Sequence, residues 1–323
     1  MTMKILLIPG LTLPNFSDDD VARIRAAAGS DAEVVVTTQA EAPRHAAQAE
    51  VILGGVPREL FQAAPRLRWA QATSSGVDPY LYPEFRDSDV LLTSEKGLVG
   101  EHLADHAFGL LLLLTRQLTT TFKMGPDAWN RRPELRRQMV ELSGLTMGII
   151  GFGGTGRAVA RRAHAFGMHC QAIDRDPVPN SPEVSEVQRP TFFATLLETS
   201  DVVAICCPLT PETRGLFNSE AFTHMKPSAL LVNVTRGEIV VEDALVKALQ
   251  AKQFRGAALD VAPREPLPPD SALWDMENVV MTPHTAGASQ YRAGRNIDRF
   301  VRNLERLRRN EPLEGVIDKQ LGY

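Results

Sequence analysis

The sequence predicts an α/β protein made of two doubly wound parallel-sheet domains. Strand-like and helix-like segments alternate over residues 1–100, and a second alternating set begins at Thr146. A glycine-rich turn, 151–156, follows the first strand of this second set. Such alternation is typical of a parallel sheet with helices on both faces. The 323 residues are enough for two hydrophobic cores.

The first hundred residues contain five apolar runs that predict strands, because strands of a parallel sheet are buried on both faces. A helix is expected at Asp18–Ala28, where Asp18 can cap the first turn and Val21 and Ile24 fall on one side. The five strands are expected at 4–8, 33–37, 51–53, 67–72 and 90–93.

The middle of the chain changes character twice. Residues 102–118 are strongly apolar and predict a buried helix. Residues 119–143 are polar, charged and irregular, and they include Trp129. We expect an arm or long connection there, because segments of this length in compact domains are usually functional or form interfaces.

The second half of the chain predicts six strands joined by helices, which is typical of a dinucleotide-binding sheet. Residues 289–309 follow with a helical pattern that has one apolar side, while arginines cover the rest as a solvated face. The six strands are expected at 147–150, 169–174, 202–206, 229–234, 257–260 and 279–282.

Composition excludes several classes of protein. A hydrophobic content of 44% with 23% charged residues is ordinary for a globular chain. The net charge of −4 argues against a nucleic-acid or anionic-membrane partner. The longest apolar run, 107–114, is far shorter than the ~20 residues of a membrane span.

The sequence also predicts the cellular location of the protein and whether it binds a metal. The N-terminal apolar run stops at Pro9-Gly10, too early for a signal peptide, so a cytoplasmic protein is expected. The three cysteines, Cys170, Cys206 and Cys207, show neither a disulfide framework nor metal-ligand spacing. No metal is expected.

The turn Gly151-Phe152-Gly153-Gly154-Thr155-Gly156 lies between an apolar strand and a helix, the context in which this glycine pattern predicts dinucleotide binding. Gly151 permits the tight turn, Gly153 lets the backbone approach the pyrophosphate, and Gly156 lets helix and strand pack closely. The helix N-terminus then offers N–H groups to the phosphates. Gly154 and Thr155 complete the predicted set.

Asp174 ends the next strand, 18 residues after Gly156. A carboxylate there accepts hydrogen bonds from the adenosine ribose and repels a 2′-phosphate, which favours NAD. The neighbouring Arg175 keeps NADP open, because a guanidinium can accommodate that phosphate. We therefore expect residues 101–288 to form a Rossmann NAD-binding domain. Residues 1–100, completed by the C-terminal helix 289–323, are expected to form a smaller flavodoxin-like substrate domain.

Three polar segments follow predicted strands, at the edge where open α/β sheets bind ligands. In Asn233–Gly237, Arg236 offers a planar fork for a substrate carboxylate and carbonyl. In Thr282–Gly287, His284 can donate a proton at neutral pH. In Asp260–Leu267, Glu265 can support and orient the imidazolium. This set predicts hydride-transfer chemistry on a small 2-oxo acid, with His284 as base in the oxidative direction.

Nearly the whole chain resembles the D-isomer-specific 2-hydroxyacid dehydrogenase family, in its glyoxylate/hydroxypyruvate reductase-like or phosphoglycerate dehydrogenase-like branches without a regulatory domain. The motifs are GFGGTGR, CPLTPETRG, NVTRGEIVVEDAL, ALDVAPREPLP and TPHTAG, in family order. The resemblance implies that Arg236 binds substrate and that Glu265 and His284 form the acid–base pair. It implies an Asp260 contact with the nicotinamide amide, and Cys207, Thr235 and Gly287 beside the cofactor.

The resemblance also implies that Ser75 and Gly76 hold the substrate carboxylate through backbone N–H groups. It implies a homodimer with residues 119–143 as its arm, where Trp129 serves either as an anchor or as a contact to the partner's site. Two features depart from the family pattern: Thr155 stands where an aliphatic residue is usual, and Ser74-Ser75-Gly76 with Glu95-Lys96-Gly97 form a more polar substrate loop. The second leaves the substrate and the role of Lys96 open.

Two alternatives remain at this stage. One is phosphite-type oxidation on the same fold, since the Arg–Glu–His set does not exclude it; formate oxidation is disfavoured because that branch carries Gln in place of Glu265. The other is a non-enzymatic NAD-sensing protein. Among the seven histidines, His102, His106 and His164 lie in helical patterns and are interpreted as ordinary core or surface residues.

Overall fold

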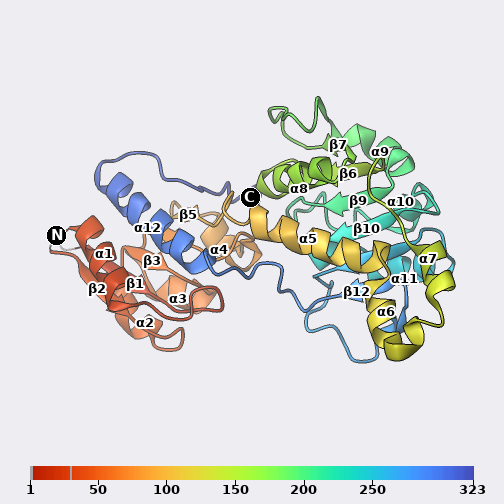
Figure 1. The fold of residues 1–323 in the computed structure, drawn as a ribbon. Helices are drawn as coiled ribbons and strands as arrows, with labels where there is room; N and C mark the ends of the chain where they lie inside the picture. Colours follow the sequence, from red (N-terminus) through yellow and green to blue (C-terminus); the bar gives the residue numbers. More distant parts are fainter. Residues whose placement is uncertain (1–2, 30) are drawn as a thin grey trace. The chain divides into compact units, whose positions relative to one another are not determined.

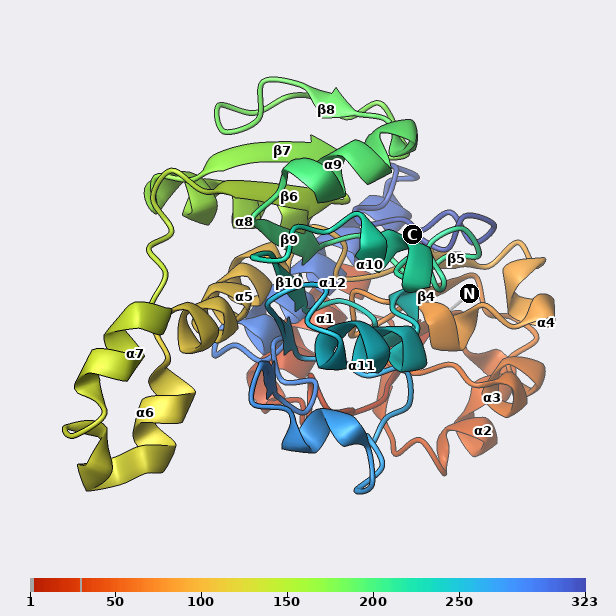
Figure 2. The ribbon, with the colours of Figure 1, turned by 90° about the vertical axis from the view of Figure 1, so that its right-hand side faces the viewer.

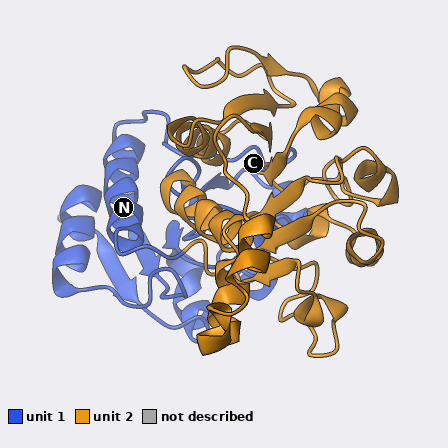
Figure 3. Ribbon diagram, turned by 45° about the vertical axis from the view of Figure 1, so that its right-hand side comes forward, with its two compact units in different colours: residues 1–99, 288–323 blue, residues 100–287 orange. Residues whose placement is uncertain are grey.

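The computed structural model describes residues 3–29 and 31–323, which form two compact units (Figure 3). Unit 1 comprises the described residues up to Val99 together with Ala288–Tyr323, and unit 2 comprises Gly100–Gly287. Each unit is built on a parallel sheet with helices on both faces (Figure 1). The predicted fold class is therefore confirmed.

The sheet of unit 1 has five parallel strands in the order β2-β1-β3-β4-β5. This is the flavodoxin-like order 2-1-3-4-5. All five strands were predicted, and their ends differ from the expected ones by at most two residues. The strands are β1 (Lys4–Leu7), β2 (Glu33–Val36), β3 (Val51–Leu53), β4 (Trp69–Gln71) and β5 (Leu91–Thr93).

Helices α1 (Asp18–Ala28) and α12 (Arg292–Arg308) share a core with one face of this sheet, where Trp69 stacks on Phe300. Ser17, not Asp18, caps α1: the Ser17 hydroxyl accepts from the Asp20 N–H, and the Asp20 carboxylate accepts from the Ser17 N–H, a capping box. The other face carries α2 (Ala42–His45), α3 (Arg58–Ala63) and α4 (Pro83–Arg86).

The sheet of unit 2 has seven parallel strands in the order β12-β11-β10-β9-β6-β7-β8. If β6 is numbered as strand 1, β8 to β11 follow the Rossmann order 3-2-1-4-5-6, and β12 adds a seventh strand beside β11. Six of the strands were predicted, and β8 (Val187–Gln188) was missed because two residues carry no periodicity. The others are β6 (Thr146–Ile150), β7 (His169–Ile173), β9 (Val202–Ile205), β10 (Leu230–Asn233), β11 (Gly256–Leu259) and β12 (Val279–Met281).

Helices cover both faces of the second sheet. Helices α5 (Gly100–Thr115) and α8 (Gly154–Ala165) share one core with the sheet. Helices α9 (Phe193–Thr199), α10 (Ser219–Thr223) and α11 (Glu242–Gln250) share the other. In the described part of the chain, no helix combines the length and apolar character needed to cross a membrane.

The segment predicted to be irregular, 119–143, is helical over most of its length, so that part of the prediction is wrong. It contains α6 (Leu118–Met124) and α7 (Arg132–Gln138), which project from the end of α5 away from the sheet (Figure 2). Phe122 and Trp129 are 73% and 77% exposed there. Two large apolar side chains exposed on the same arm make it a candidate interaction surface.

Candidate functional site

The three polar segments follow three neighbouring strands. β10, β11 and β12 pair in parallel, with Asn233 opposite Leu259 and Leu259 opposite Met281. The carboxyl ends of these strands therefore meet at one edge, from which Arg236, Glu265 and His284 all follow. This is the edge at which ligands bind in open α/β sheets.

His284 and Glu265 form a direct pair. The His284 Nδ1 lies 2.7 Å from the Glu265 Oε2, and the Glu265 Oε1 accepts from the Ala262 N–H at 3.1 Å. The two side chains are 43% and 37% exposed, so a small molecule can reach them. Since Nδ1 faces the carboxylate, Nε2 is the ring nitrogen turned away from it and available for proton transfer.

Asp260 holds the turn that carries His284. Its side chain is fully buried, and its carboxylate accepts from the Thr282 hydroxyl at 2.6 Å, the Thr285 N–H at 2.9 Å and the Ala286 N–H at 2.8 Å. The Asp260 carbonyl also accepts from the His284 N–H at 2.7 Å. His284 has a φ of 53°, a left-handed conformation that few residues other than glycine adopt and that is often found at functional sites.

His106 was interpreted as an ordinary helical histidine, and the structure places it beside this turn. From α5, its Nε2 lies 2.8 Å from the Thr282 Oγ1 and 3.3 Å from the Asp260 Oδ1. The sequence gives no signal for this contact, because 176 residues separate His106 from Thr282. The pairing depends on how α5 packs against β11 and β12.

Arg236 lies half-buried in the loop after β10. The Asn233 side chain donates to the Arg236 carbonyl at 2.9 Å, and Arg236 Nη1 donates to the Thr235 carbonyl at 2.8 Å. Next to it, a Cβ on Gly237 would overlap the carbonyl of Ala262. Only glycine lets the Arg236 loop approach the loop that carries Glu265 this closely.

The glycine-rich turn has the geometry that a dinucleotide requires. Gly151 has a φ of 89°, and a Cβ there would collide with the backbone of Cys207. A Cβ on Gly156 would overlap the Gly151 carbonyl, so helix and strand pack in direct contact. Gly153 faces open space, and α8 begins at Gly154. The turn therefore fits a diphosphate bound at the N-terminus of a 12-residue helix.

Asp174 follows β7 and is already tied to this turn. Its Oδ2 accepts from the Phe152 N–H at 2.6 Å, and its Oδ1 accepts from the Asp176 N–H at 2.9 Å. A carboxylate has about four acceptor sites, so capacity remains for a ribose hydroxyl. Arg175 is exposed beside it, 3.8 Å from the Glu212 carboxylate.

The remaining predicted cofactor residues lie at strand ends or loop ends of unit 2. Cys207 follows β9, and burial raises the pKa of its thiol to about 12, so it is inert at neutral pH. The Thr235 hydroxyl donates to the Asn233 Oδ1 at 3.2 Å. Thr155 is half-buried in the first turn of α8, and Gly287 is the last residue of unit 2.

Ser75 and Gly76 lie in unit 1, in the loop after β4. The Ser74 hydroxyl donates to the Gly76 carbonyl at 2.7 Å, and the Glu95 N–H donates to the Ser74 carbonyl at 3.1 Å. The Glu95 side chain is 1% exposed and accepts from Arg292 Nε at 2.9 Å. Burial raises the pKa of Glu95, and Arg292 opposes that rise.

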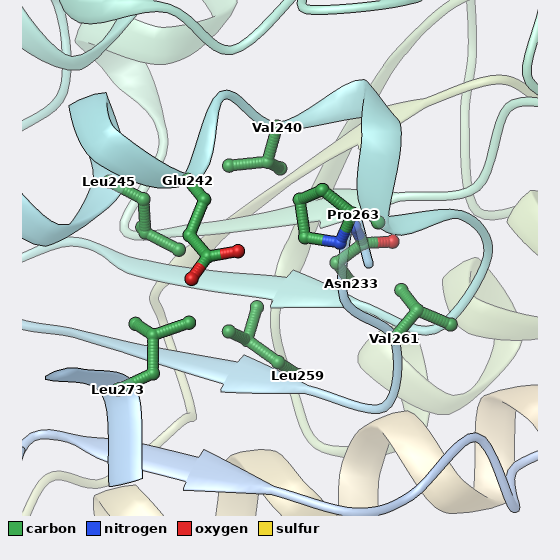
Figure 4. A pocket seen from close by; sticks show the side chains of 9 residues that line it. Asn233, Val240, Glu242, Leu245, Leu259, Val261, Pro263 and Leu273 are labelled. Atoms are coloured by element: carbon green, nitrogen blue, oxygen red, sulfur yellow. The ribbon is translucent and has the colours of Figure 1, made fainter. Parts of the chain in front are cut away.

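A small pocket is lined by residues from the ends of β10 and β11, the loops at Gly237 and Pro263, and helix α11 (Figure 4). Most of its lining is apolar, and its one charged side chain is Glu242, whose carboxylate accepts from the Ser271 hydroxyl at 3.0 Å. A pocket with a carboxylate and no cation in its lining does not suit an anionic substrate. Among residues 3–29 and 31–323, no group of three or more His, Cys, Asp or Glu is arranged to hold a metal ion.

Comparison with known proteins gives consistent matches. Residues 108–286 match the model of the D-isomer specific 2-hydroxyacid dehydrogenase NAD binding domain. A glyoxylate reductase of Korarchaeum cryptofilum is 34% identical over 274 residues, which is 82% of this chain and 80% of that protein. An (S)-sulfolactate dehydrogenase of Chromohalobacter salexigens is 35% identical over 235 residues, 72% of this chain and 75% of that protein.

Solved structures have the same fold. The NADPH-dependent glyoxylate/hydroxypyruvate reductase of Sinorhizobium meliloti, in complex with NADP and sulfate, superimposes with a TM-score of 0.79. It is 27% identical, and the match covers 100% of both chains.

Proposed function

This chain belongs to the D-isomer specific 2-hydroxyacid dehydrogenase family, and we propose that it is an NAD-dependent enzyme that interconverts a small 2-oxo acid and its D-2-hydroxy acid. The observation that carries the proposal is the 2.7 Å contact between His284 Nδ1 and Glu265. An imidazole supported by a carboxylate, with its second nitrogen turned away, is the usual arrangement of a general acid or base.

His284 is the proton donor in the direction of reduction. As C2 is reduced, Nε2–H of His284 gives its proton to the former carbonyl oxygen, and Glu265 stabilises the imidazolium before the transfer. In the direction of oxidation, neutral His284 takes the hydroxyl proton at the same nitrogen. Asp260 keeps the imidazole in place through the turn that it holds.

Arg236 is the substrate clamp in this proposal. A guanidinium binds a carboxylate through two parallel N–H groups and polarises the neighbouring carbonyl. The N–H groups of Ser75 and Gly76 are proposed, from the family resemblance, as further donors to the substrate carboxylate. The Arg236 clamp selects a small molecule with a carboxylate next to its carbonyl.

The glycine turn and its surroundings are the proposed cofactor site. When bound, NADH supplies the hydride that C2 accepts. The turn and the α8 N-terminus would hold the diphosphate, and the Asp174 carboxylate would accept from the ribose and disfavour a 2′-phosphate. Cys207, Thr235, Asp260 and Gly287 are proposed to line the rest. Arg175 remains the feature that would admit NADP.

Two features of the proposal concern the whole protein. A homodimer is proposed, with α6 and α7 as the arm, because Phe122 and Trp129 are apolar and exposed there. All three cysteines are free thiols, which suits the reducing cytoplasm that we propose as the location.

The test follows NADH absorbance with purified protein against a panel of 2-oxo acids. The panel holds glyoxylate, hydroxypyruvate, pyruvate, phenylpyruvate, a branched 2-oxo acid and 3-sulfopyruvate. We expect NADH consumption with at least one member, and a fall of at least about 10²-fold in kcat/KM when Arg236 is changed to Lys, because the bidentate clamp is lost.

Parallel reactions with phosphite or formate and NAD address other chemistry on the same fold. Turnover of phosphite alone would replace the proposal with phosphite oxidation. Tight NADH binding with no turnover of any compound would make the protein a non-enzymatic NAD sensor.

A further inference from the structure

Unit 2 contains an imidazole–carboxylate contact that the proposed reaction does not use. His106 Nε2 lies 3.3 Å from the Asp260 Oδ1 and 2.8 Å from the Thr282 Oγ1. His106 comes from α5, which packs across the sheet and contacts β10, β11 and β12 (Figure 1). The Asp260 side chain is fully buried, whereas 25% of the His106 side chain is exposed.

The hydrogen-bond directions at this point can be assigned. Thr282 has one hydroxyl proton, and its oxygen lies 2.6 Å from the Asp260 Oδ1, which as a carboxylate only accepts. The Thr282 proton therefore goes to Asp260. The Thr282 oxygen must then accept from His106, so the His106 proton is on Nε2. His106 and Thr282 thus form a chain of donors that ends on the buried carboxylate of Asp260.

This chain leads to His284. The same carboxylate accepts from the N–H groups of Thr285 and Ala286, and the Asp260 carbonyl accepts from the His284 N–H. The donors to Asp260 therefore fix the whole turn 282–286. His284 needs this support, because its φ of 53° is a conformation that surrounding contacts must impose.

We propose that His106 is a positioning residue for His284. By donating to Thr282 and lying against Asp260, it fixes the orientation of the carboxylate that holds the His284 turn. The inference rests on the proposed function, in which His284 transfers the proton. It adds a residue from a helix that otherwise contributes no side chain to the chemistry.

A purely structural histidine at position 106 would only fill space, whereas a positioning histidine would donate a hydrogen bond from its Nε2–H to Thr282. The two roles are separated by His106→Gln, whose side-chain amide can place a donor where Nε2–H was, and His106→Phe, which keeps the ring volume without a donor. Thr282→Val removes the bridging hydroxyl with the same shape. His164→Gln, at an exposed position on α8, is the matched control.

Kinetics with NADH and the best 2-oxo acid of the panel give the first readout. We expect His106→Phe and Thr282→Val to lower kcat by about tenfold or more, the effect of one lost hydrogen bond to a charged network. The KM for NADH should stay within about twofold. His106→Gln should recover most of the wild-type kcat, and His164→Gln should equal the wild type.

The second readout is independent of activity. In cofactor-free protein labelled with 13C at the histidine Cε1, the His284 signal is assigned from its loss in His284→Ala. We expect that signal to shift or broaden in His106→Phe and Thr282→Val but to keep its wild-type position in His106→Gln and His164→Gln. If His106→Phe does not fold, the kinetics and the His284 signal of Thr282→Val test the positioning role.

The outcomes separate this inference from the proposed function. An inactive wild type whose His284 signal responds to His106→Phe would overturn the reaction and keep the positioning role. An active wild type whose kcat and His284 signal are unchanged in both His106→Phe and Thr282→Val would overturn the positioning role and keep the reaction. Equal losses in His106→Gln and His106→Phe would make His106 a packing residue.

Discussion

At the scale of single residues, the proposed chemistry depends on one partly exposed hydrogen bond and on the buried carboxylate beneath it. Glu265 bonds the imidazole of His284 directly, while Asp260 bonds the turn on which that imidazole stands. The two acids have different surroundings, one 37% exposed and one fully buried. We therefore expect them to have different tasks, one electrostatic and one positional.

Glu265→Gln tests the electrostatic task. The amide keeps a hydrogen-bond partner for Nδ1 but removes the anion that stabilises the imidazolium. In reduction assays at neutral pH, both kcat and kcat/KM should fall. Glu220→Gln, at an exposed position on α10, is the control. A kcat equal to that of the wild type would remove Glu265 from the acid–base pair.

Substitutions of Asp174 test the preference for NADH over NADPH. Asp174→Ala removes both the acceptor for the ribose and the charge that repels a 2′-phosphate, so the ratio of kcat/KM for NADH to that for NADPH should fall by about tenfold or more. Asp174→Asn keeps an acceptor for the Phe152 N–H and should give an intermediate ratio. The ribose assignment would be contradicted by the same ratio in wild type and Asp174→Ala.

Much of the candidate site could be predicted at this scale, because Arg236, Glu265 and His284 each follow a recognisable buried strand. Parallel strands bring their carboxyl ends to one edge, so the pairing of Glu265 with His284 follows from topology. His106 could not be predicted, because its partners are far away in the sequence and helical periodicity does not specify what a polar side chain meets. The turn-holding contacts of Asp260 required the loop geometry.

At the scale of elements, close approach of two loops sets the spacing of the site. Gly237 lets the loop after β10 touch the loop after β11, and a Cβ there would overlap Ala262. The strands themselves were predictable because each is a continuous apolar run. Helices α6 and α7 were not, since seven residues each are too few for a helical periodicity to be recognised.

Gly237→Ala should therefore separate the loops that carry Arg236 and Glu265. Overpacking of this kind costs about 1–3 kcal/mol of stability, so the melting temperature should fall by several degrees. The kcat/KM for the 2-oxo acid should fall further than stability alone explains. Gly109→Ala on α5, where a Cβ meets open space, should leave both unchanged or slightly raise stability. Identical behaviour of the two variants in calorimetry and kinetics would contradict the close-approach argument.

At the scale of the whole molecule, the alternation of strands and helices was sufficient to predict two doubly wound sheets. The flavodoxin-like and Rossmann orders of those sheets are the two common orders of doubly wound parallel sheets. The short edge strand β8 escaped prediction because its position depends on pairing with β7. The substrate remains the least predictable feature, since it depends on loops such as 74–76 and 95–97.

The arm formed by α6 and α7 is the proposed homodimer interface, which predicts how its variants assemble. Phe122 and Trp129 would be buried in the proposed homodimer, so changing both to Ser should convert a particle of twice 35.5 kDa into one of 35.5 kDa. Sedimentation equilibrium measures the masses. Leu11→Ser, at a fully exposed apolar residue outside the arm, should leave the wild-type mass unchanged. A monomeric wild type, or a dimer that survives the double substitution, would contradict the arm as the interface.

The central claim is most directly tested by following the hydride itself. NADH carrying deuterium at the transferable position of nicotinamide C4 is incubated with the protein and the preferred 2-oxo acid, and the product is examined by NMR and chiral chromatography. We predict a D-2-hydroxy acid with deuterium at C2, formed at least about 10²-fold more slowly by His284→Ala at similar NADH affinity. Bound NADH with no deuterium in any 2-hydroxy acid, or equal rates in wild type and His284→Ala, would contradict the account.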